Sequence, residues 1–338
     1  MRHTVLTEMP DAEMAKRWND FLLGVSFATH YVTPNYFIDP YVTGRRFAVI
    51  TEDDSGIAAV MTGVVEGAKA VAGMFSRPQI VFRKGVDRAA AMSSLISGIE
   101  QLIGTKSLVE IYSWEPFDEV SMSNVSVVES GDETSVVMLD LSKGADAIFA
   151  GFSQTRRNEI RKALRHQIVE VKDLETDEEL AELYEIHCEW NERKGHTPGS
   201  LEQMRTAFRQ RENRRIFIAK TENKVIAGSF YRFCPGGVVE YAANFSLPDY
   251  QRLRPNDLIG WHAIQWACSE GFSHFSMGGS HLFLRRFGGE IKQTFCYRRD
   301  NRAFGLETVS EHARHFGAAA YQRLPENVRS GVRRMLAR

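Results

Sequence analysis

The chain has 338 residues, a length that favours two domains of ordinary size. Hydrophobic residues make up 43% and charged residues 25%, which excludes a disordered or fibrous protein. The 42 basic and 43 acidic residues give a net charge of -1, which argues against a protein that coats nucleic acid by bulk charge alone.

The four cysteines, Cys188, Cys234, Cys268 and Cys296, form no Cys-x-x-Cys pair. We therefore expect no metal site and no disulfide framework, and reduced thiols in a cytoplasmic protein. No signal-type segment opens the chain, and no apolar run is long enough to predict a membrane span. The basic end of the chain, residues 327–338, either touches the inner membrane surface or forms a solvated helix, and the second interpretation is the simpler one.

The first half predicts strands, helices and turns in a regular order. A strand at 4–9 precedes a helix that Asp11 caps and that runs to residue 23. After an irregular aromatic segment, 28–41, three strands follow at 45–51, 57–65 and 70–75. Asp87 caps a helix to residue 103, which Gly104 ends. Strand-like stretches then lead to residue 144.

The second half repeats this order. A helix over 145–167, with a break around 151–155, leads to a strand at 168–174. Thr176 with Glu179, and Ser200 with Gln203, have capping-box spacing at the start of two helices. Three strands at 216–220, 225–233 and 238–246, a helix over 256–270 and a short strand at 274–277 follow. Because the offset between the passes stays near about 165 residues, we predict two copies of one α/β unit.

The stretch 238–299 combines a strand, a polar loop, a helix and a glycine-rich loop. This order places a helix N-terminus and a glycine loop beside one strand, an arrangement that can hold phosphates next to a reacting carbonyl. Asn256 at the helix start, with Arg252 and Arg254 before it, is a candidate phosphate clamp. The alternative is an ordinary capped helix with solvated arginines.

The strand of that stretch carries a carboxylate among apolar residues. Strict alternation would place Glu240 and Asn244 on one face and Tyr241 on the other. Glu240 is then a candidate base, or a residue that holds an amine, with Asn244 as its partner. The alternative is a polar edge that faces solvent.

The glycine-rich loop supplies further candidates: Gly279 and Ser280 for substrate binding, and His281 as a base or phosphate ligand. A histidine beside glycines is more often a loop residue with a structural bond. Arg285 and Arg286 are candidates to contact phosphate or carboxylate from the cleft. Four arginines on the helix 154–166 form either a basic rail for an anionic partner or a solvated face, and without interleaved aromatic residues the solvated face is the simpler interpretation.

The order of elements in each half resembles the GNAT acyltransferase fold, and two such units in tandem resemble the Fem-type (FemAB-like) aminoacyltransferases. Three segments carry the likeness: SQTRRNEIRKAL at 153–164, LRPNDLIGWHAIQWACSEGFSHFSMGGS at 253–280 and FLRRFGGE at 283–290. Two features depart from these families. Leu284 stands where the family signature often has a lysine, and the segment 251–256 lacks the glycines of the usual phosphate loop.

This resemblance implies an α/β (α+β) fold of two GNAT-like units, each a mixed, mainly antiparallel sheet flanked by helices, at 1–144 and 145–310, with a helical tail at 311–338. It implies an N-acyltransferase or aminoacyltransferase whose second unit carries most of the site, with Tyr241 and Asn244 among the residues that bind the substrate or donor. The donor would be acyl-CoA or aminoacyl-tRNA. The acceptor would be a primary amine, on a small or lipid-linked precursor of the cell envelope, peptidoglycan or polysaccharide. The alternative is a non-catalytic GNAT-like module that binds a glycan or nucleotide.

Overall fold

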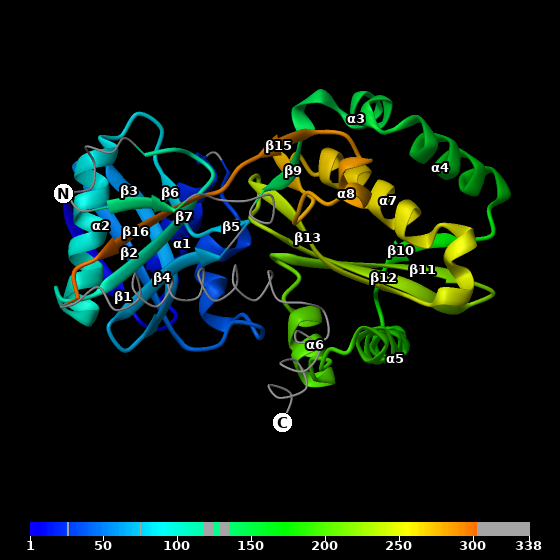
Figure 1. Ribbon diagram of the computed structural model, residues 1–338, viewed down its shortest axis with the longest axis horizontal. Helices are drawn as coiled ribbons and strands as arrows, with labels where there is room; N and C mark the ends of the chain where they lie inside the picture. The colour runs from blue at the N-terminus through cyan, green and yellow to red at the C-terminus, as the bar shows by residue number, and fades with distance from the viewer. Residues whose placement is uncertain (26, 75, 118–124, 129–134, 303–338) are drawn as a thin grey trace, which may run out of the picture.

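The computed structural model describes residues 1–25, 27–74, 76–117, 125–128 and 135–302 (Figure 1). The tail predicted at 311–338, with its membrane contact, lies outside the described residues. Two mixed sheets flanked by helices make up the fold, which confirms the predicted fold class.

The first sheet has β2 and β3 at its centre, and both faces are covered. Phe47 and Val49 of β2 pack with α2 on one face, whereas Ala48 and Ile50 pack with α1 on the other, as strand alternation requires. Its strands in spatial order are β1 (Arg2–Leu6), β2 (Arg45–Asp53), β3 (Gly56–Glu66), β4 (Lys69–Met74), β7 (Leu108–Ser113), β16 (Phe295–Asp300) and β8 (Val125–Val128), with β5 (Arg77–Pro78) on β4 and β6 (Ile80–Phe82) on β3. The helices around it are α1 (Ala12–Leu22), η1 (His30–Val32), η2 (Pro34–Ile38) and α2 (Arg88–Ile103).

The second sheet is covered in the same way, with α3, α4 and α7 on one face and α5 and α6 on the other (Figure 1). Phe217 of β11 packs with the α7 side, whereas Ile216 and Ile218 pack with the α5 side. Its strands in spatial order are β10 (Glu170–Asp173), β11 (Arg214–Thr221), β12 (Lys224–Phe233), β13 (Val238–Ser246), β14 (His274–Ser276), β9 (Val136–Asp140) and β15 (Glu290–Lys292). The helices are η5 (Leu141–Lys143), α3 (Ala145–Gly151), α4 (Gln154–His166), α5 (Asp177–Lys194), α6 (Leu201–Arg209), η6 (Pro248–Leu253), α7 (Pro255–Ser269) and α8 (Leu282–Arg285).

The two sheets exchange strands. β9 precedes residue 144 in the chain yet pairs with β14 and β15 in the second sheet. β16 comes near the end of the described chain yet pairs with β7 and β8 in the first sheet. The division at residue 144 stays a prediction, and each unit contains a strand from the other side of it.

Local signals for helix starts are matched closely. Asp11 accepts from the N–H of Met14 and Asp87 from that of Ala90. The predicted break at 151–155 separates α3 from α4, and Ser153 caps α4. The capping box at Ser200 is complete, but the carboxylate of Glu179 accepts from Glu175 instead of closing a box with Thr176. The short helix α8 was not predicted, because the sequence there was interpreted as a loop.

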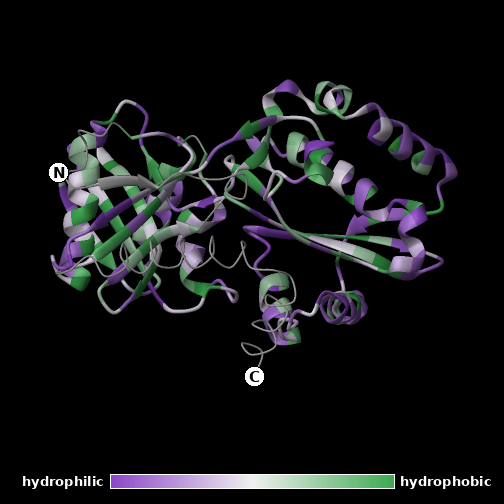
Figure 2. Ribbon diagram, viewed as in Figure 1, coloured by the Kyte–Doolittle hydropathy of each residue, from purple (hydrophilic) through white to green (hydrophobic). Residues whose placement is uncertain are grey.

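Hydrophilic residues dominate α4 and α5, whereas the sheets carry most of the hydrophobic ones (Figure 2). Within the described ranges, none of the helices combines the length and the apolar composition that crossing a membrane would need.

Candidate active site

The second sheet opens next to β13. This strand pairs with β14 in parallel only from Val238 to Glu240, opposite His274 to Ser276. β13 then continues to Ser246, and among the described residues no strand pairs with that edge beyond Glu240. Backbone groups along this edge are therefore available to a ligand, because an unpaired strand edge presents N–H and C=O groups.

A β-bulge sits at the start of this open edge. Tyr231 pairs with Tyr241 and the preceding Phe230 pairs with Ala243, so Ala242 is an extra residue in β13. Tyr241 packs with the core below α7, whereas Ala243 packs with the core below α5. Beyond the bulge, Asn244 lies opposite Ser229 and so shares the α7 side with Tyr241.

This corrects the prediction from strict alternation. Glu240 and Asn244 were placed together on one face, with Tyr241 on the other, but the bulge shifts the alternation by one residue. Asn244 therefore accompanies Tyr241, and Glu240 faces away from both. A single inserted residue produces this change, because side chains in a strand alternate with a period of two.

Glu240 lies at the junction of the two units. Its carboxylate accepts a hydrogen bond of 2.7 Å from Nε of Arg77 in β5, and only 6% of the residue is exposed. Burial alone would raise the pKa of Glu240, but the charges of Arg77 and Arg232 outweigh burial and lower it. A carboxylate held in its ionised form is a poor proton acceptor, so these contacts favour a role in joining the units.

Tyr241 faces the opening between β13 and the start of α7. Its ring centroid lies 5.7 Å from that of Tyr231. Burial raises the pKa of Tyr241, so the phenol stays protonated. Tyr241 can therefore donate a hydrogen bond or a proton.

The start of α7 is fixed to the end of β13. Arg254 adopts a left-handed conformation with φ of 58° immediately before Pro255, and Nδ2 of Asn256 donates to the Ser246 hydroxyl at 3.2 Å. Oδ1 of Asn256 is buried and has no hydrogen-bond partner among the described residues. Because buried polar atoms are normally paired, this oxygen marks a position where a ligand group can bind.

Two ion pairs attach α4 to this end of α7. Arg156 contacts Asp257 at 2.5 Å, and Glu159 accepts from Arg254 at 2.7 Å. The Arg156 guanidinium also stacks on Phe283 and Phe287, with distances of 4.3 and 3.9 Å to their ring centroids. Arg156 is thus a buried core residue, which corrects both interpretations of the arginines on this helix as an exposed rail or a solvated face.

The predicted phosphate clamp is partly assembled, in a different position. Asp257 places a carboxylate in the first turn of α7, and Pro255 has no N–H, so that turn is a weaker anion site than predicted. Arg252 and Arg254 instead line a pocket of about 70 Å³ with Lys162 and His166 of α4. The sequence gave no signal for these two residues, which α4 brings next to η6.

The glycine-rich loop is fixed to the sheet. Gly278 has a φ of 73°, and a Cβ there would lie 2.4 Å from the carbonyl oxygen of Tyr241. The carbonyl of Gly279 accepts from Val137, and the Ser280 hydroxyl lies 2.6 Å from that of Ser135. Gly279 and Ser280 therefore contact β9 and the segment before it.

The remaining candidates lie on α8. His281 is exposed at its start, Arg285 donates through Nε to the Ser280 carbonyl at 2.5 Å, and the Arg286 side chain is exposed. Leu284 is 3% exposed in the core below α7, so the residue that replaces the signature lysine is a packing residue. The structure thus brings Tyr241, Asn244 and Asn256 together, but it separates Glu240 from them.

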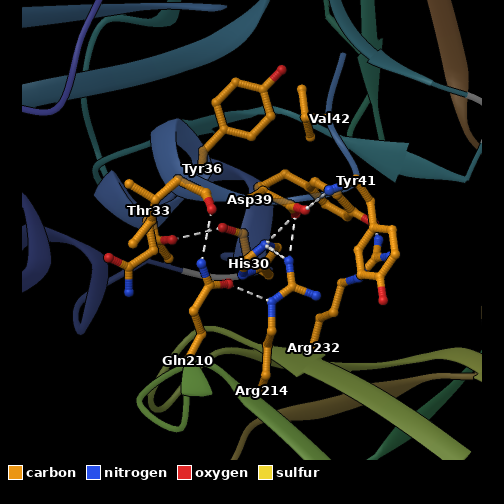
Figure 3. A network of polar contacts seen from close by, with 12 residues as sticks. His30, Thr33, Tyr36, Asp39, Tyr41, Val42, Gln210, Arg214 and Arg232 are labelled. Atoms are coloured by element: carbon orange, nitrogen blue, oxygen red, sulfur yellow. Dashed lines mark hydrogen bonds and ion pairs between the residues drawn. The ribbon is translucent and has the colours of Figure 1, made fainter. Parts of the chain in front are cut away.

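A buried polar network joins the units beside Glu240 (Figure 3). The carboxylate of Asp39 lies 2.8 Å from the His30 ring and 2.6 Å from the Arg214 guanidinium. Nε of Arg214 donates to Gln210 at 2.8 Å, and Gln210 donates to the Ile38 carbonyl at 2.8 Å. The units are thus held together by polar contacts with defined geometry, which fixes their relative orientation.

In the part of the chain that the structure describes, no cluster of three or more His, Cys, Asp or Glu residues could hold a metal ion. The groups described above can hold a carbonyl, phosphates and an amine.

Comparisons with known proteins agree with this geometry. Residues 150–287 match the family model described as an acetyltransferase (GNAT) domain. Among solved structures, the chain is similar to FemX, with a TM-score of 0.69 at 11% identity over 88% of this chain and 97% of that one. A comparison with curated proteins gives no match.

Two further solved structures are similar. One is the C-terminal domain assigned to a lysylphosphatidylglycerol synthetase from Agrobacterium fabrum, with a TM-score of 0.59 at 12% identity over 85% of this chain and 92% of that one. The other is L-PGS from Bacillus licheniformis, with a TM-score of 0.56 at 15% identity over 90% and 96%. The second unit thus matches a GNAT acetyltransferase domain, and the chain has the tandem GNAT-like fold of the Fem type.

Proposed function

We propose that the chain is an N-acyltransferase or aminoacyltransferase. It moves an acyl or aminoacyl group from a thioester or ester donor to a primary amine. The observation that carries this proposal is the open edge of β13, where the bulge directs Tyr241 and Asn244 toward the start of α7.

The donor carbonyl fits along this edge. Backbone N–H groups of an unpaired strand can stabilise the negative oxygen that forms when an amine attacks a carbonyl. The new C–N bond forms as the C–S or C–O bond of the donor breaks, and the leaving thiolate or alkoxide needs a proton. Tyr241 can supply it, because burial keeps its phenol protonated.

The phosphates of the donor fit the basic pocket between α4 and η6. Arg252, Lys162 and His166 line it, while Arg254 is shared with Glu159. Acyl-CoA and aminoacyl-tRNA both carry phosphates at a distance from the reacting carbonyl, so this pocket suits either donor. Arg285 and Arg286 stay predicted contacts for the same charges.

The base that removes the amine proton stays a prediction. Glu240 and His281 were the candidates, and the ion pair with Arg77 makes Glu240 the weaker of the two. The acceptor we propose is a primary amine on a small or lipid-linked precursor of the cell envelope, peptidoglycan or polysaccharide. The likeness to FemX and to structures assigned to lysylphosphatidylglycerol synthesis supports this class.

The test is transfer with purified protein. Labelled acetyl-CoA and charged bulk tRNA are each incubated with a panel of amines, including amino sugars and lysine-bearing peptides. We expect amine-dependent release of coenzyme A or uncharged tRNA, lost in Tyr241→Phe and retained in Tyr112→Phe. Release that does not depend on an amine or on Tyr241 would contradict the proposed role of the open edge.

A non-catalytic binding module is the alternative, favoured by two features. Leu284 is buried where the family signature has a lysine, and the segment 251–256 lacks glycines. This alternative predicts saturable binding of a nucleotide or glycan with no turnover of either donor.

A further inference from the structure

A second cavity, of about 500 Å³, lies at the free end of β9, beyond the last pair with β15. Residues of both units line it: Phe27, Trp114 and Phe295 on one side, and Asp140, His274 and Lys292 on the other. Figure 1 shows β9 and β15 at the junction between the two sheets. The strands β14 and β9 separate this cavity from the open edge of β13, so it is distinct from the proposed active site.

The walls of this junction cavity are aromatic. The Phe27 ring lies 4.4 Å from the His274 ring and 6.1 Å from the Trp114 ring, measured between centroids. Phe27 holds this position with a φ of 60°, a left-handed conformation that is unfavourable for a residue other than glycine. Residues in such conformations cluster at ligand sites, where the surrounding structure holds them.

The indole N–H of Trp114 lacks an acceptor. Trp114 is 5% exposed, and Nε1 has no hydrogen-bond partner among the described residues. An indole N–H can only donate, and a buried donor without a partner costs about 1–3 kcal/mol. An oxygen atom of a ligand in the cavity would satisfy it.

Lys292 adds a positive charge. Its Nζ lies 4.1 Å from the centroid of the Phe27 ring, and no described carboxylate forms an ion pair with it. Burial lowers the pKa of Lys292, while the charges of Glu115 and Glu290 oppose this effect. Lys143 adds a second cation, and the carboxylate of Asp140 is occupied by the N–H and hydroxyl of Ser142.

We propose that the junction cavity binds a small molecule that carries an oxyanion, a carboxylate or a phosphate, next to an aromatic or apolar group. The oxyanion pairs with Lys292 and accepts from the Trp114 indole, and the apolar group packs between Phe27 and Phe295. The volume is within the range of small-molecule sites, about 300–1,000 Å³. Because both units line the cavity, a bound ligand stabilises their junction.

The test uses the full chain with 1-naphthoate and 1-naphthyl phosphate as probes, followed by calorimetry and by the indole N–H signals in NMR. The signal of Trp114 is identified by its loss in Trp114→Phe. We expect saturable binding of at least one probe, a shift of the Trp114 signal, and affinity weakened at least about tenfold in Lys292→Met, because an ion pair and a hydrogen bond are both removed. Lys292→Arg should retain binding.

The matched control is Lys224→Met, because Lys224 also lies over an aromatic ring, at 5.6 Å from the Tyr250 centroid, but outside this cavity. It should bind as the unchanged protein does. Competition by acetate or by inorganic phosphate distinguishes a carboxylate site from a phosphate site. Absence of binding by both probes, equal binding in Lys292→Met, or an unmoved Trp114 signal would overturn the proposal. No acyl donor is present, so the result is independent of the proposed transfer.

Discussion

The two units treat their parallel strand pair differently. In the first, β4 pairs with β7 from Lys69 to Ala72, and the end of β4 at Gly73 and Met74 pairs with β5. In the second, β13 pairs with β14 over three positions and then continues without a partner among the described residues. β5 therefore occupies in the first unit the place that stays open in the second.

This difference assigns separate roles to two similar units. The strand that closes the first unit carries Arg77, whose side chain reaches Glu240 at the base of the opening in the second. The first unit thus supports the wall of the site, while the second provides the open edge. A duplicated fold can in this way devote one copy to positioning and the other to binding.

The largest expected effect is on the contact between the units. Arg77→Met leaves the buried carboxylate of Glu240 without its closest partner, which should cost about 3 kcal/mol in the free energy of unfolding. Urea unfolding measures this loss. Arg83→Met, which removes a more exposed pair with Asp53, is the control and should cost less. Equal losses in the two variants would show that the Arg77 pair does not join the units.

The next effect separates chemistry from packing. Tyr241→Phe keeps the ring beside Tyr231 but removes the proton donor, so kcat should fall about 100-fold with little change in melting temperature. Tyr112→Phe, in the first unit, should retain kcat. A normal rate in Tyr241→Phe would move the proton donor elsewhere in the site.

The interface should also respond to pH. Burial lowers the pKa of His30 to about 4, although its hydrogen bond to Asp39 opposes this. The unfolded chain binds a proton near the ordinary value of about 6.5, so stability is full above that pH and falls as the pH drops toward 4. Unfolding experiments from pH 7.5 to 4.5 should show this slope, reduced in His30→Gln and unchanged in His196→Gln. The same slope in both variants would assign it to other groups.

The smallest effect concerns the donor phosphates. Arg252→Ala and Lys162→Ala should each raise KM for the donor by about fivefold, near 1 kcal/mol, more at low salt than at high salt. Lys84→Ala, in the first unit, serves as the control. A fall in kcat with unchanged KM would place these residues at the reacting carbonyl instead of the phosphates.

Local patterns predicted much of the fold. Asp11, Asp87 and Ser200 begin helices because their side chains accept from backbone N–H groups three residues later, which needs no distant partner. The repeated order of elements and the break between α3 and α4 are likewise local. The tandem GNAT-like resemblance built on this order is confirmed by the comparisons.

Side-chain positions at the site were harder to predict. The extra residue Ala242 carries no turn or glycine signal, so alternation placed Glu240 with Asn244. Arg156 looks like any arginine on a polar helix, yet it pairs with Asp257 and stacks on two phenylalanines. Arg77 lies 163 positions from Glu240, and no local spacing connects them.

The sequence by itself therefore determined the elements, their repetition and the segment 238–299 as the place to search for a site, because helix caps and hydrophobic periodicity act within a few residues. Only the tertiary structure decided which sheet receives β9 and β16, that β5 closes one unit while β13 stays open in the other, and which polar groups meet. Strand exchange, bulges and ion pairs across units depend on contacts between residues far apart in the chain, and their energies appear only when the sheets pack.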